Sequence, residues 1–212
     1  IQVSRPDDAG YCSFGLSCDY TKAAAEKAKV VIAEMNESMP YVGGDNRVHV
    51  SRLDYIIPTN LPVPEISLPE ISEVEKAIGR NCAALIEDGS TLQLGIGAIP
   101  DAVLLFMKDK NDLGIHTEMF SDGVIDLVES GVINGSRKTL HPGKLVATFL
   151  MGTRRLYDFV DRNPDVEMYP VDYVNDPRVI AQNEKMVSIN SCIEVDLTGQ
   201  VASETIGLRQ FS

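Results

Sequence analysis

The segment HTEMFSDG places a single carboxylate, Glu118, at or just before the end of a strongly apolar run. A carboxylate in such surroundings is costly when it is buried and unpaired, so it must be exposed, paired with a cation or placed for function. An ionised glutamate can attack an activated carbonyl group as a nucleophile. The pattern fits a solvent-facing glutamate on an edge strand equally well. Glu194, which alternates with apolar residues in a later segment, is the main rival carboxylate, although we expect it to face water.

A glycine-rich turn, QLGIGAIP, follows another apolar run. Gly95 and Gly97 would let a ligand approach the backbone closely, and N–H groups at the end of the strand could donate to it. The helix that begins near Pro100 would present its positive end, which favours an anion. A single GxG motif is also found in ordinary turns between a strand and a helix, so a purely structural turn is the alternative.

Two further strand ends carry groups that could hold an anionic ligand. Arg154 and Arg155 follow a run that ends at Gly152, and they could reach phosphate or carboxylate groups. Surface pairing with nearby acids, such as Asp158 one helical turn after Arg154, is the alternative. Asn190 ends the run MVSIN, where its amide could hold a ligand or close a turn.

Four other polar positions have structural interpretations. Ser121 and Asp122 are expected to cap the helix that follows them, and Thr153 is expected to cap the helix that begins at Arg154. We expect His116 to be a core or pocket histidine rather than a catalytic base.

Alternating strands and helices would position these residues. Strands or extended segments are predicted over 30–34, 47–50, 91–97, 113–120, 145–152, 166–175 and 186–201, the last with a turn around 198–199. Helices are predicted over 23–29, 72–89, 100–110, 124–131, 153–162 and 176–185. Ser72 and Glu75 form a capping-box pattern at the start of the second helix. The alternation predicts an α/β fold with mostly parallel sheets flanked by helices. Four prolines over 57–71 predict a linker there.

The composition limits the partners of the protein. The 212 residues are 44% hydrophobic and 24% charged, and the formal net charge of −12 argues against binding to nucleic acid or to an anionic membrane. The four cysteines form no CxxC pair and have no histidine at metal-ligand spacing, so no metal site is expected. No run is long enough to span a membrane and no signal peptide is recognisable, so we expect a cytoplasmic protein with reduced thiols.

Four long segments, taken in order, resemble the class I CoA-transferases, in particular the branch of 4-hydroxybutyrate CoA-transferases and acetyl-CoA hydrolases/transferases. They are EDGSTLQLGIGAIPDAV, GIHTEMFSDGVIDL, FLMGTRRLYDF and MVSINSCIEVDLTGQVASETIG. The resemblance also crosses the proline-rich stretch and covers essentially the whole chain. It implies a CoA-transferase (NagB/RpiA-like) fold, and it favours Glu118 over Glu194 as a nucleophile.

The resemblance also implies a reaction. Glu118 would attack an acyl-CoA, form a covalent glutamyl-CoA thioester and pass the CoA to a second carboxylate in a ping-pong sequence. The substrates would be short acyl-CoAs and short carboxylates, with CoA as a substrate rather than a permanently bound cofactor, and with no metal. Backbone donors near Gly95 and Gly97 would stabilise the oxyanions. The residues implied to contact CoA are Gln93, Leu94, Gly95, Ile96, Gly97, Ala98 and Asn190.

Two alternatives to this reaction stay open. An acyl-CoA hydrolase would use the same nucleophile with water as the acceptor, and a non-catalytic binding module could share the fold. The resemblance also implies a homodimer or homotetramer. It predicts that residues 1–56 are the C-terminal part of a first α/β domain, 57–71 a linker, and 72–212 a second α/β domain that is truncated before a glycine-rich segment of the CoA site.

Overall fold

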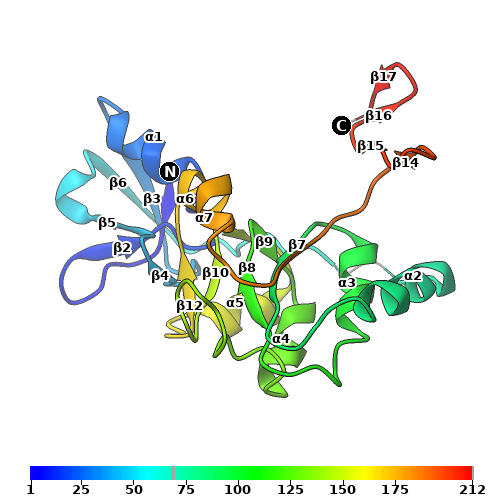
Figure 1. Cartoon of the computed structure of the whole chain (residues 1–212). Helices are drawn as coiled ribbons and strands as arrows, with labels where there is room; N and C mark the ends of the chain where they lie inside the picture. Colours follow the sequence, from blue (N-terminus) through cyan, green and yellow to red (C-terminus); the bar gives the residue numbers. More distant parts are fainter. Residues whose placement is uncertain (68–69, 212) are drawn as a thin grey trace.

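Short runs of apolar and β-branched residues form the strands of two parallel sheets in the computed structural model, which describes residues 1–67 and 70–211 (Figure 1). The larger sheet has six strands in the order β13-β7-β8-β10-β12-β4, and every neighbouring pair is parallel. The predicted α/β fold with a mostly parallel sheet is therefore confirmed. The strands are β4 (Gly43–Gly44), β7 (Thr91–Leu94), β8 (Gly114–His116), β10 (Leu145–Ala147), β12 (Val166–Met168) and β13 (Met186–Ile189).

The order of these strands reverses at β7. From β7 the chain moves through β8, β10 and β12 in one direction, and it then returns to place β13 on the opposite side of β7. Ligands in open α/β sheets bind outside the carboxyl ends of the strands at such a reversal. The ends of β7, β8 and β13 are therefore the place where this topology favours a site.

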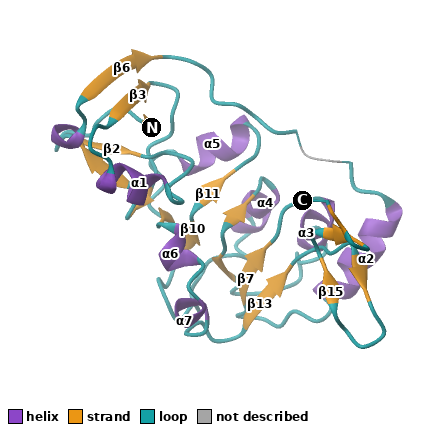
Figure 2. Cartoon of the chain, turned by 90° about the horizontal axis from the view of Figure 1, so that it is seen from above, coloured by secondary structure: helices purple, strands orange, loops and turns teal. Residues whose placement is uncertain are grey.

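Helices cover both faces of the large sheet (Figure 2). Three of them, α3 (Ala98–Leu104), α4 (Gly123–Glu129) and α5 (Arg154–Val160), follow strand ends, and α3 and α4 lie across the sheet from the short helices α6 (Val171–Val174) and α7 (Pro177–Ile180). The main apolar core lies between these elements. Its fully buried members include Leu92, Ile115, Phe120, Ile125 and Leu156.

Helix α2 (Glu73–Ala83) begins with the predicted capping box. The Glu75 backbone amide donates to the Ser72 hydroxyl at 3.3 Å, and the Ser72 amide donates to the Glu75 carboxylate at 2.7 Å. The helix ends several residues before Gly89, which lies in a turn with φ +75°. Gly79 lets α2 approach α3, because a Cβ there would lie 2.6 Å from the Ala102 carbonyl.

The first part of the chain forms the smaller sheet. Its strands are β1 (Gln2–Val3), β3 (Ile32–Asn36) and β6 (Tyr55–Thr59), all parallel, with α1 (Thr21–Lys27) before β3. The antiparallel pair β2 (Tyr11–Ser13) and β5 (Arg47–His49) and the turn η1 (Val50–Arg52) lie beside it. Pro58 lies in β6, at the edge of the sheet, where its missing N–H disrupts no ladder. Strand β6 thus extends into the predicted linker, of which residues 68 and 69 lie outside the described residues.

Three of the predicted strands are broken or end early in the structure. The continuous strands predicted over 113–120 and 145–152 are each split, so that β9 (Met119–Phe120) and β11 (Phe149–Leu150) form a separate parallel pair. The extended segment predicted over 166–175 ends at Met168, and α6 follows it.

The C-terminal segment forms two small hairpins that project from the body of the molecule (Figure 1). Strands β14 (Glu194–Val195) and β15 (Val201–Ala202) are antiparallel around the predicted turn at 198–199, and β16 (Thr205–Ile206) pairs with β17 (Arg209–Gln210). Across residues 1–67 and 70–211, no helix combines the length and apolar character needed to cross a membrane. The same residues contain no cluster of histidine, cysteine and carboxylate groups suited to a metal ion.

Candidate active site

Glu118 lies in the break between β8 and β9. Its side chain is exposed, although β8 is an interior strand of the large sheet. The amides of Thr148 and Phe149 both donate to the Glu118 carbonyl, at 3.0 and 3.1 Å. Two residues therefore oppose one, as in a β-bulge, a feature that redirects a side chain. Thr117 and Met119 on either side are buried, whereas the Glu118 side chain is exposed. Glu118 itself lies in neither strand: it follows β8, which lies between β7 and β10, and it precedes β9.

Thr117 holds this break against the neighbouring strand. Its buried hydroxyl accepts a hydrogen bond from the Leu94 amide at 2.9 Å, and it lies 2.9 Å from the Met119 carbonyl, to which it can donate. One hydroxyl therefore joins the end of β7 to both sides of Glu118. The backbone that carries the carboxylate is fixed even though the carboxylate itself is exposed.

Glu118, Gln93 and Asn190 line one cavity of about 350 Å³ at the ends of β8, β7 and β13. Three residues predicted from separate segments are thus brought together at the reversal of strand order. His116 and Asn175 line the same cavity. Glu194 lies instead in the exposed β14 strand of the projecting hairpin.

Neutral polar groups from β7 and from the end of β13 line the same cavity as the nucleophile candidate. The Asn190 amide nitrogen donates to Gln93 Oε1 at 2.8 Å, and Gln93 Nε2 donates to Asn190 Oδ1 at 3.1 Å. Ser188, which lies opposite Gln93 in the β13–β7 register, donates to the same Gln93 oxygen. Gly95 is required by this array, because a Cβ there would lie 2.6 Å from Asn190 Oδ1.

The rest of the glycine-rich turn lies around an adjacent hollow of about 100 Å³. Gly95, Ile96 and Gly97 line it, together with the apolar side chains of Met119 and Met151. Gly97 has φ +119°, a conformation that favours glycine. The side chain of Leu94 is buried in the core, and Ala98 is the first residue of α3.

One expected role of this turn does not fit the structure. The Gly95 N–H donates to the Ile189 carbonyl at 2.8 Å, so it is already engaged and is not available to an oxyanion. This hydrogen bond joins the glycine-rich turn to the end of β13, so the Gly95 amide has a structural role.

His116 is buried, as expected, and it faces the end of α6. Its Nε2 lies 2.9 Å from the Val174 carbonyl, which can only accept, so Nε2 carries the hydrogen. Burial lowers the pKa of His116, which favours the neutral ring. Asn175, the residue after Val174, donates its side-chain amide to Glu118 Oε2.

The capping predictions are only partly right. Thr153 caps α5, with its hydroxyl accepting from the Arg155 amide at 3.2 Å. Asp122 occupies the N-cap position of α4 but makes no side-chain cap there, and it binds Thr153 instead. Ser121 donates to Asp101 at 2.6 Å, and burial is the main cause that raises the pKa of that carboxyl. Neither predicted α4 cap forms, because both side chains point to other elements.

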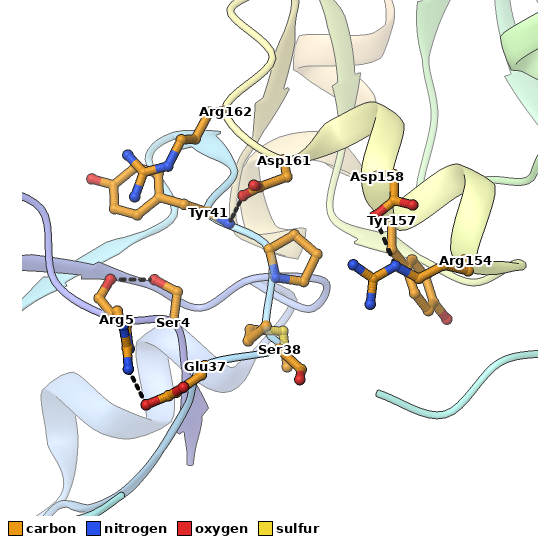
Figure 3. Close-up of a pocket in the computed structure, with 12 residues that line it drawn as sticks. Ser4, Arg5, Glu37, Ser38, Tyr41, Arg154, Tyr157, Asp158, Asp161 and Arg162 are labelled. Atoms are coloured by element: carbon orange, nitrogen blue, oxygen red, sulfur yellow. Dashed lines mark hydrogen bonds and ion pairs between the residues drawn. The ribbon is translucent and has the colours of Figure 1, made fainter. Parts of the chain in front are cut away.

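The arginines after Gly152 pair with acids, which confirms the alternative interpretation. Arg154 binds Asp158 at 2.7 Å in a hollow between α5 and the first part of the chain (Figure 3). Arg155 binds Asp126 and Glu129 at 2.7 and 2.9 Å. Arg154 and Arg155 do not line the cavity that contains Glu118.

Three residues of the site were not found by sequence reasoning, namely Thr117, Asn175 and Ser188. The only signal for Asn175 is the Asn-Asp-Pro turn between two apolar segments. Thr117 and Ser188 are hydroxyl residues within or beside strands, where polarity alone does not separate a structural group from a functional one.

Two models of one protein family match the two ends of the chain. Residues 1–67 match the family model of the acetyl-CoA hydrolase/transferase N-terminal domain, and residues 152–212 match that of the C-terminal domain.

Individual relatives match across the whole chain. A 4-hydroxybutyrate coenzyme A transferase of Clostridium kluyveri is 66% identical over 212 residues, which are 100% of this chain and 49% of that protein. A succinyl-CoA:cyclohexane-1-carboxylate CoA transferase of Geobacter metallireducens is 49% identical over 99% of this chain and 48% of its own length. The crystal structure of a 4-hydroxybutyrate CoA-transferase from Porphyromonas gingivalis superposes with a TM-score of 0.92 at 58% identity, covering 95% of this chain and 51% of that one. The chain spans about half the length of the curated relatives it matches.

Proposed function

Since the chain belongs to the acetyl-CoA hydrolase/transferase family, we propose that its protein transfers coenzyme A from a short acyl-CoA to a free carboxylate, with Glu118 as the nucleophile. The observation that carries the proposal is the position of Glu118. Its carboxylate is exposed in a cavity at the reversal of strand order, on a backbone fixed by Thr117. The acyl groups proposed are 4-hydroxybutyryl, butyryl and acetyl.

The reaction splits one exchange into steps that each suit a carboxylate. Glu118 attacks the thioester carbonyl, the C–S bond breaks, and a mixed anhydride and a CoA thiolate form. The thiolate attacks the glutamyl carbonyl, which gives a glutamyl-CoA thioester and releases the acyl group as a carboxylate with one oxygen from Glu118. An acceptor carboxylate reverses these steps, leaves as acyl-CoA and returns one of its own oxygens to Glu118.

The walls of the site supply groups suited to CoA. Gln93 and Asn190 present amide donors and acceptors beside Glu118 without a charge that would bind the carboxylate permanently. The adjacent hollow, which Gly95, Ile96 and Gly97 line with two methionines, suits an apolar part of the substrate. We include Ala98 in the CoA site through its backbone, whereas Leu94, with a buried side chain and an amide bound to Thr117, supports the site from behind.

The proposal is tested by locating the covalent intermediate. The intact protein is mixed with acetyl-CoA or butyryl-CoA, treated with borohydride, which reduces a thioester to an alcohol, and digested for mass spectrometry. The modification is expected on the peptide that contains Glu118, and it should be absent from Glu118→Gln. Glu194→Gln is the matched control and should react like the unmodified protein. Modification of Glu194, or exchange by Glu118→Gln, would show that the assignment is wrong.

Oxygen transfer gives an independent test of the same steps. With an ¹⁸O-labelled carboxylate acceptor, the label should enter the Glu118 side chain during turnover. Turnover of acyl-CoA should also depend on the acceptor, because a transferase passes the CoA to it and releases no free CoA. If free CoA is released at the same rate with and without acetate or butyrate, water resolves the intermediate and the protein is a hydrolase.

A further inference from the structure

The hollow beside the glycine-rich turn contains a carboxyl group that the proposed reaction does not use. Met119 and Met151 make part of its lining apolar, but Asp101 and Ser121 line it as well. Asp101 lies in the first turn of α3 and is half-buried. A carboxyl group in such surroundings is costly unless it has partners or serves a function.

The partners of Asp101 occupy only one of its two oxygens. The Ser121 hydroxyl donates to Asp101 Oδ1 at 2.6 Å. Within residues 1–67 and 70–211, Asp101 Oδ2 accepts no hydrogen bond and Asp101 forms no ion pair. Burial is the main cause that raises the pKa of Asp101, the Ser121 hydrogen bond opposes it, and the nearby charge of Asp122 adds to it. The hollow therefore offers a free acceptor oxygen with no cation beside it.

The hollow lies next to the cavity of the nucleophile candidate. Met119 is the next residue after Glu118, and Ser121 is the third, and both line the hollow. Gly95 lines it from the other side and also touches the main cavity, because a Cβ at Gly95 would lie 2.6 Å from Asn190 Oδ1. An acyl group whose carbonyl carbon meets Glu118 therefore has its chain beside the hollow.

The size and polarity of the hollow select among short acyl chains. Its volume of about 100 Å³ is well below that of sites for drug-sized molecules, so only a short chain fits. A hydrocarbon end would cover Asp101 Oδ2 and deprive it of hydrogen bonds. A carboxylate end would place two like charges together, which is unfavourable. A hydroxyl end can donate to the free oxygen.

We propose that Asp101, held by Ser121, accepts a hydrogen bond from the hydroxyl group of a hydroxyacyl substrate and so gives the protein a preference for 4-hydroxybutyrate over butyrate and succinate. The inference rests on the proposed function, because it concerns the acyl group that Glu118 exchanges. Asp101 is then a specificity residue, and Ser121 is its positioning residue. A site that binds a substrate hydroxyl discriminates against the analogue that lacks it, because its own polar group then loses a partner.

The test compares acceptors in the intact protein with acetyl-CoA as the donor, at pH 8, where ionised carboxylates are favoured. The measured quantity is kcat/KM for 4-hydroxybutyrate, butyrate and succinate, each divided by the value for acetate in the same variant. The division cancels any general loss of activity. The unsubstituted protein should prefer 4-hydroxybutyrate.

Two substitutions of Asp101 separate the hydrogen bond from the charge. Asp101→Leu removes both oxygens at similar size, so the ratio of 4-hydroxybutyrate to butyrate should fall by about 10- to 100-fold. Asp101→Asn removes the charge but keeps a polar amide, so succinate should gain roughly tenfold while 4-hydroxybutyrate stays within about threefold.

Two further variants test the positioning and the site. Ser121→Ala frees Asp101 Oδ1, so the preference for 4-hydroxybutyrate should fall by less than in Asp101→Leu, about two- to tenfold. Asp109→Asn is the matched control, since it makes the same change at an exposed carboxylate that follows α3 and does not line the hollow. It should leave all ratios unchanged. Unfolding curves identify any variant that fails to fold, and if Asp101→Leu does, Asp101→Asn and Ser121→Ala decide the question.

The outcomes separate this inference from the proposed function. Absence of a Glu118 thioester after mixing the unsubstituted protein with acetyl-CoA would overturn the function itself. A normal thioester in a protein that uses butyrate as well as 4-hydroxybutyrate would overturn the specificity role alone. The same conclusion would follow if folded Asp101→Leu kept the preference, or if Asp101→Asn gained nothing with succinate.

Discussion

The carboxylate of Asp122 accepts two hydrogen bonds from Thr153. The Thr153 backbone amide donates one at 2.9 Å, and the Thr153 hydroxyl donates the other. Asp122 follows β9 and Thr153 precedes α5, so the contact joins the two loops that leave the paired strands beyond Glu118. Asp122 is 5% exposed. A buried carboxylate with charge-assisted hydrogen bonds holds these loops together from the interior.

Loss of this contact should destabilise the protein. Asp122→Asn keeps the size but replaces one acceptor oxygen with an NH₂ donor. The asparagine side chain therefore cannot accept both hydrogen bonds from Thr153. The free energy of unfolding should fall by about 1–3 kcal/mol, measured by urea denaturation. Asp126→Asn is the control, since Asp126 is an exposed partner of Arg155, and its effect should stay below about 1 kcal/mol. Equal effects of the two substitutions would contradict the role given to the buried contact.

The same pair of residues shows what the sequence could predict. The cap of α5 by Thr153 is local, because the donor and acceptor lie two residues apart, and it was predicted. The partner of Asp122 lies 31 residues away, so the local pattern assigned it to the wrong helix. Glu118, Gln93 and Asn190 were each predicted from their own strand ends, and the strand order then places them together.

Other features of the site needed the structure because their cause is not local. The apolar runs around Glu118 and Thr148 are continuous in the sequence, so they predict unbroken strands. The breaks arise from hydrogen bonds between segments, in which Thr117 binds Leu94 and two amides share the Glu118 carbonyl. The contact of Asn175 with Glu118 likewise depends on the path of the chain between β12 and β13.

The two glycines of the QLGIG turn should respond differently to alanine. In Gly95→Ala the new methyl group would meet the Asn190 side chain, so the Gln93–Asn190 array should be displaced and KM for acyl-CoA should rise. In Gly97→Ala nothing lies within 4 Å of the new methyl group, but φ +119° is strained for alanine. That variant should lose about 1–3 kcal/mol of stability.

Steady-state kinetics and urea denaturation of both variants check this contrast. A larger KM for Gly97→Ala than for Gly95→Ala would argue against the role of the Asn190 array in binding.

Lys138 should make the stability depend on pH. Its side chain is buried, and its ammonium group donates to the Ile115 and Lys144 carbonyls, both at 2.7 Å. Burial lowers its pKa from 10.5 to about 7. Below about pH 7 the folded and unfolded states both carry the proton, and the cost of the buried charge is present in full. From about pH 7 to about pH 10 the unfolded state binds more protons, so the free energy of unfolding should rise with pH.

The comparison with Lys138→Met isolates this effect, because methionine does not titrate. The difference in unfolding free energy, unsubstituted protein minus variant, should increase across that range by up to about 5 kcal/mol. Burial lowers the pKa values of His116 and His141, so these groups titrate below the range. A difference that stays flat would show that Lys138 titrates near its ordinary pKa, and one that falls as the pH rises would show a pKa above it; either result contradicts the prediction.

The last prediction concerns two threonines that flank the break at Glu118 from neighbouring strands. Thr117 and Thr148 are both buried, at 1% and 0% exposure. The Thr117 hydroxyl binds the Leu94 amide, whereas the Thr148 hydroxyl has no hydrogen-bond partner among residues 1–67 and 70–211. The same substitution, threonine to valine, therefore removes a bonded hydroxyl at one site and an unbonded one at the other, with nearly equal volume.

Thr117→Val should lose about 1–3 kcal/mol, because it leaves the Leu94 amide without its acceptor in the interior. Its rate of Glu118 thioester formation should also fall, since the backbone that carries the carboxylate is released. Thr148→Val should keep or slightly raise the stability, because it removes a buried polar group that has no partner. Denaturation curves and single-turnover labelling of the two variants make the comparison. If Thr148→Val slows labelling as much as Thr117→Val, tight packing around the break, rather than the Thr117–Leu94 hydrogen bond, holds Glu118 in place.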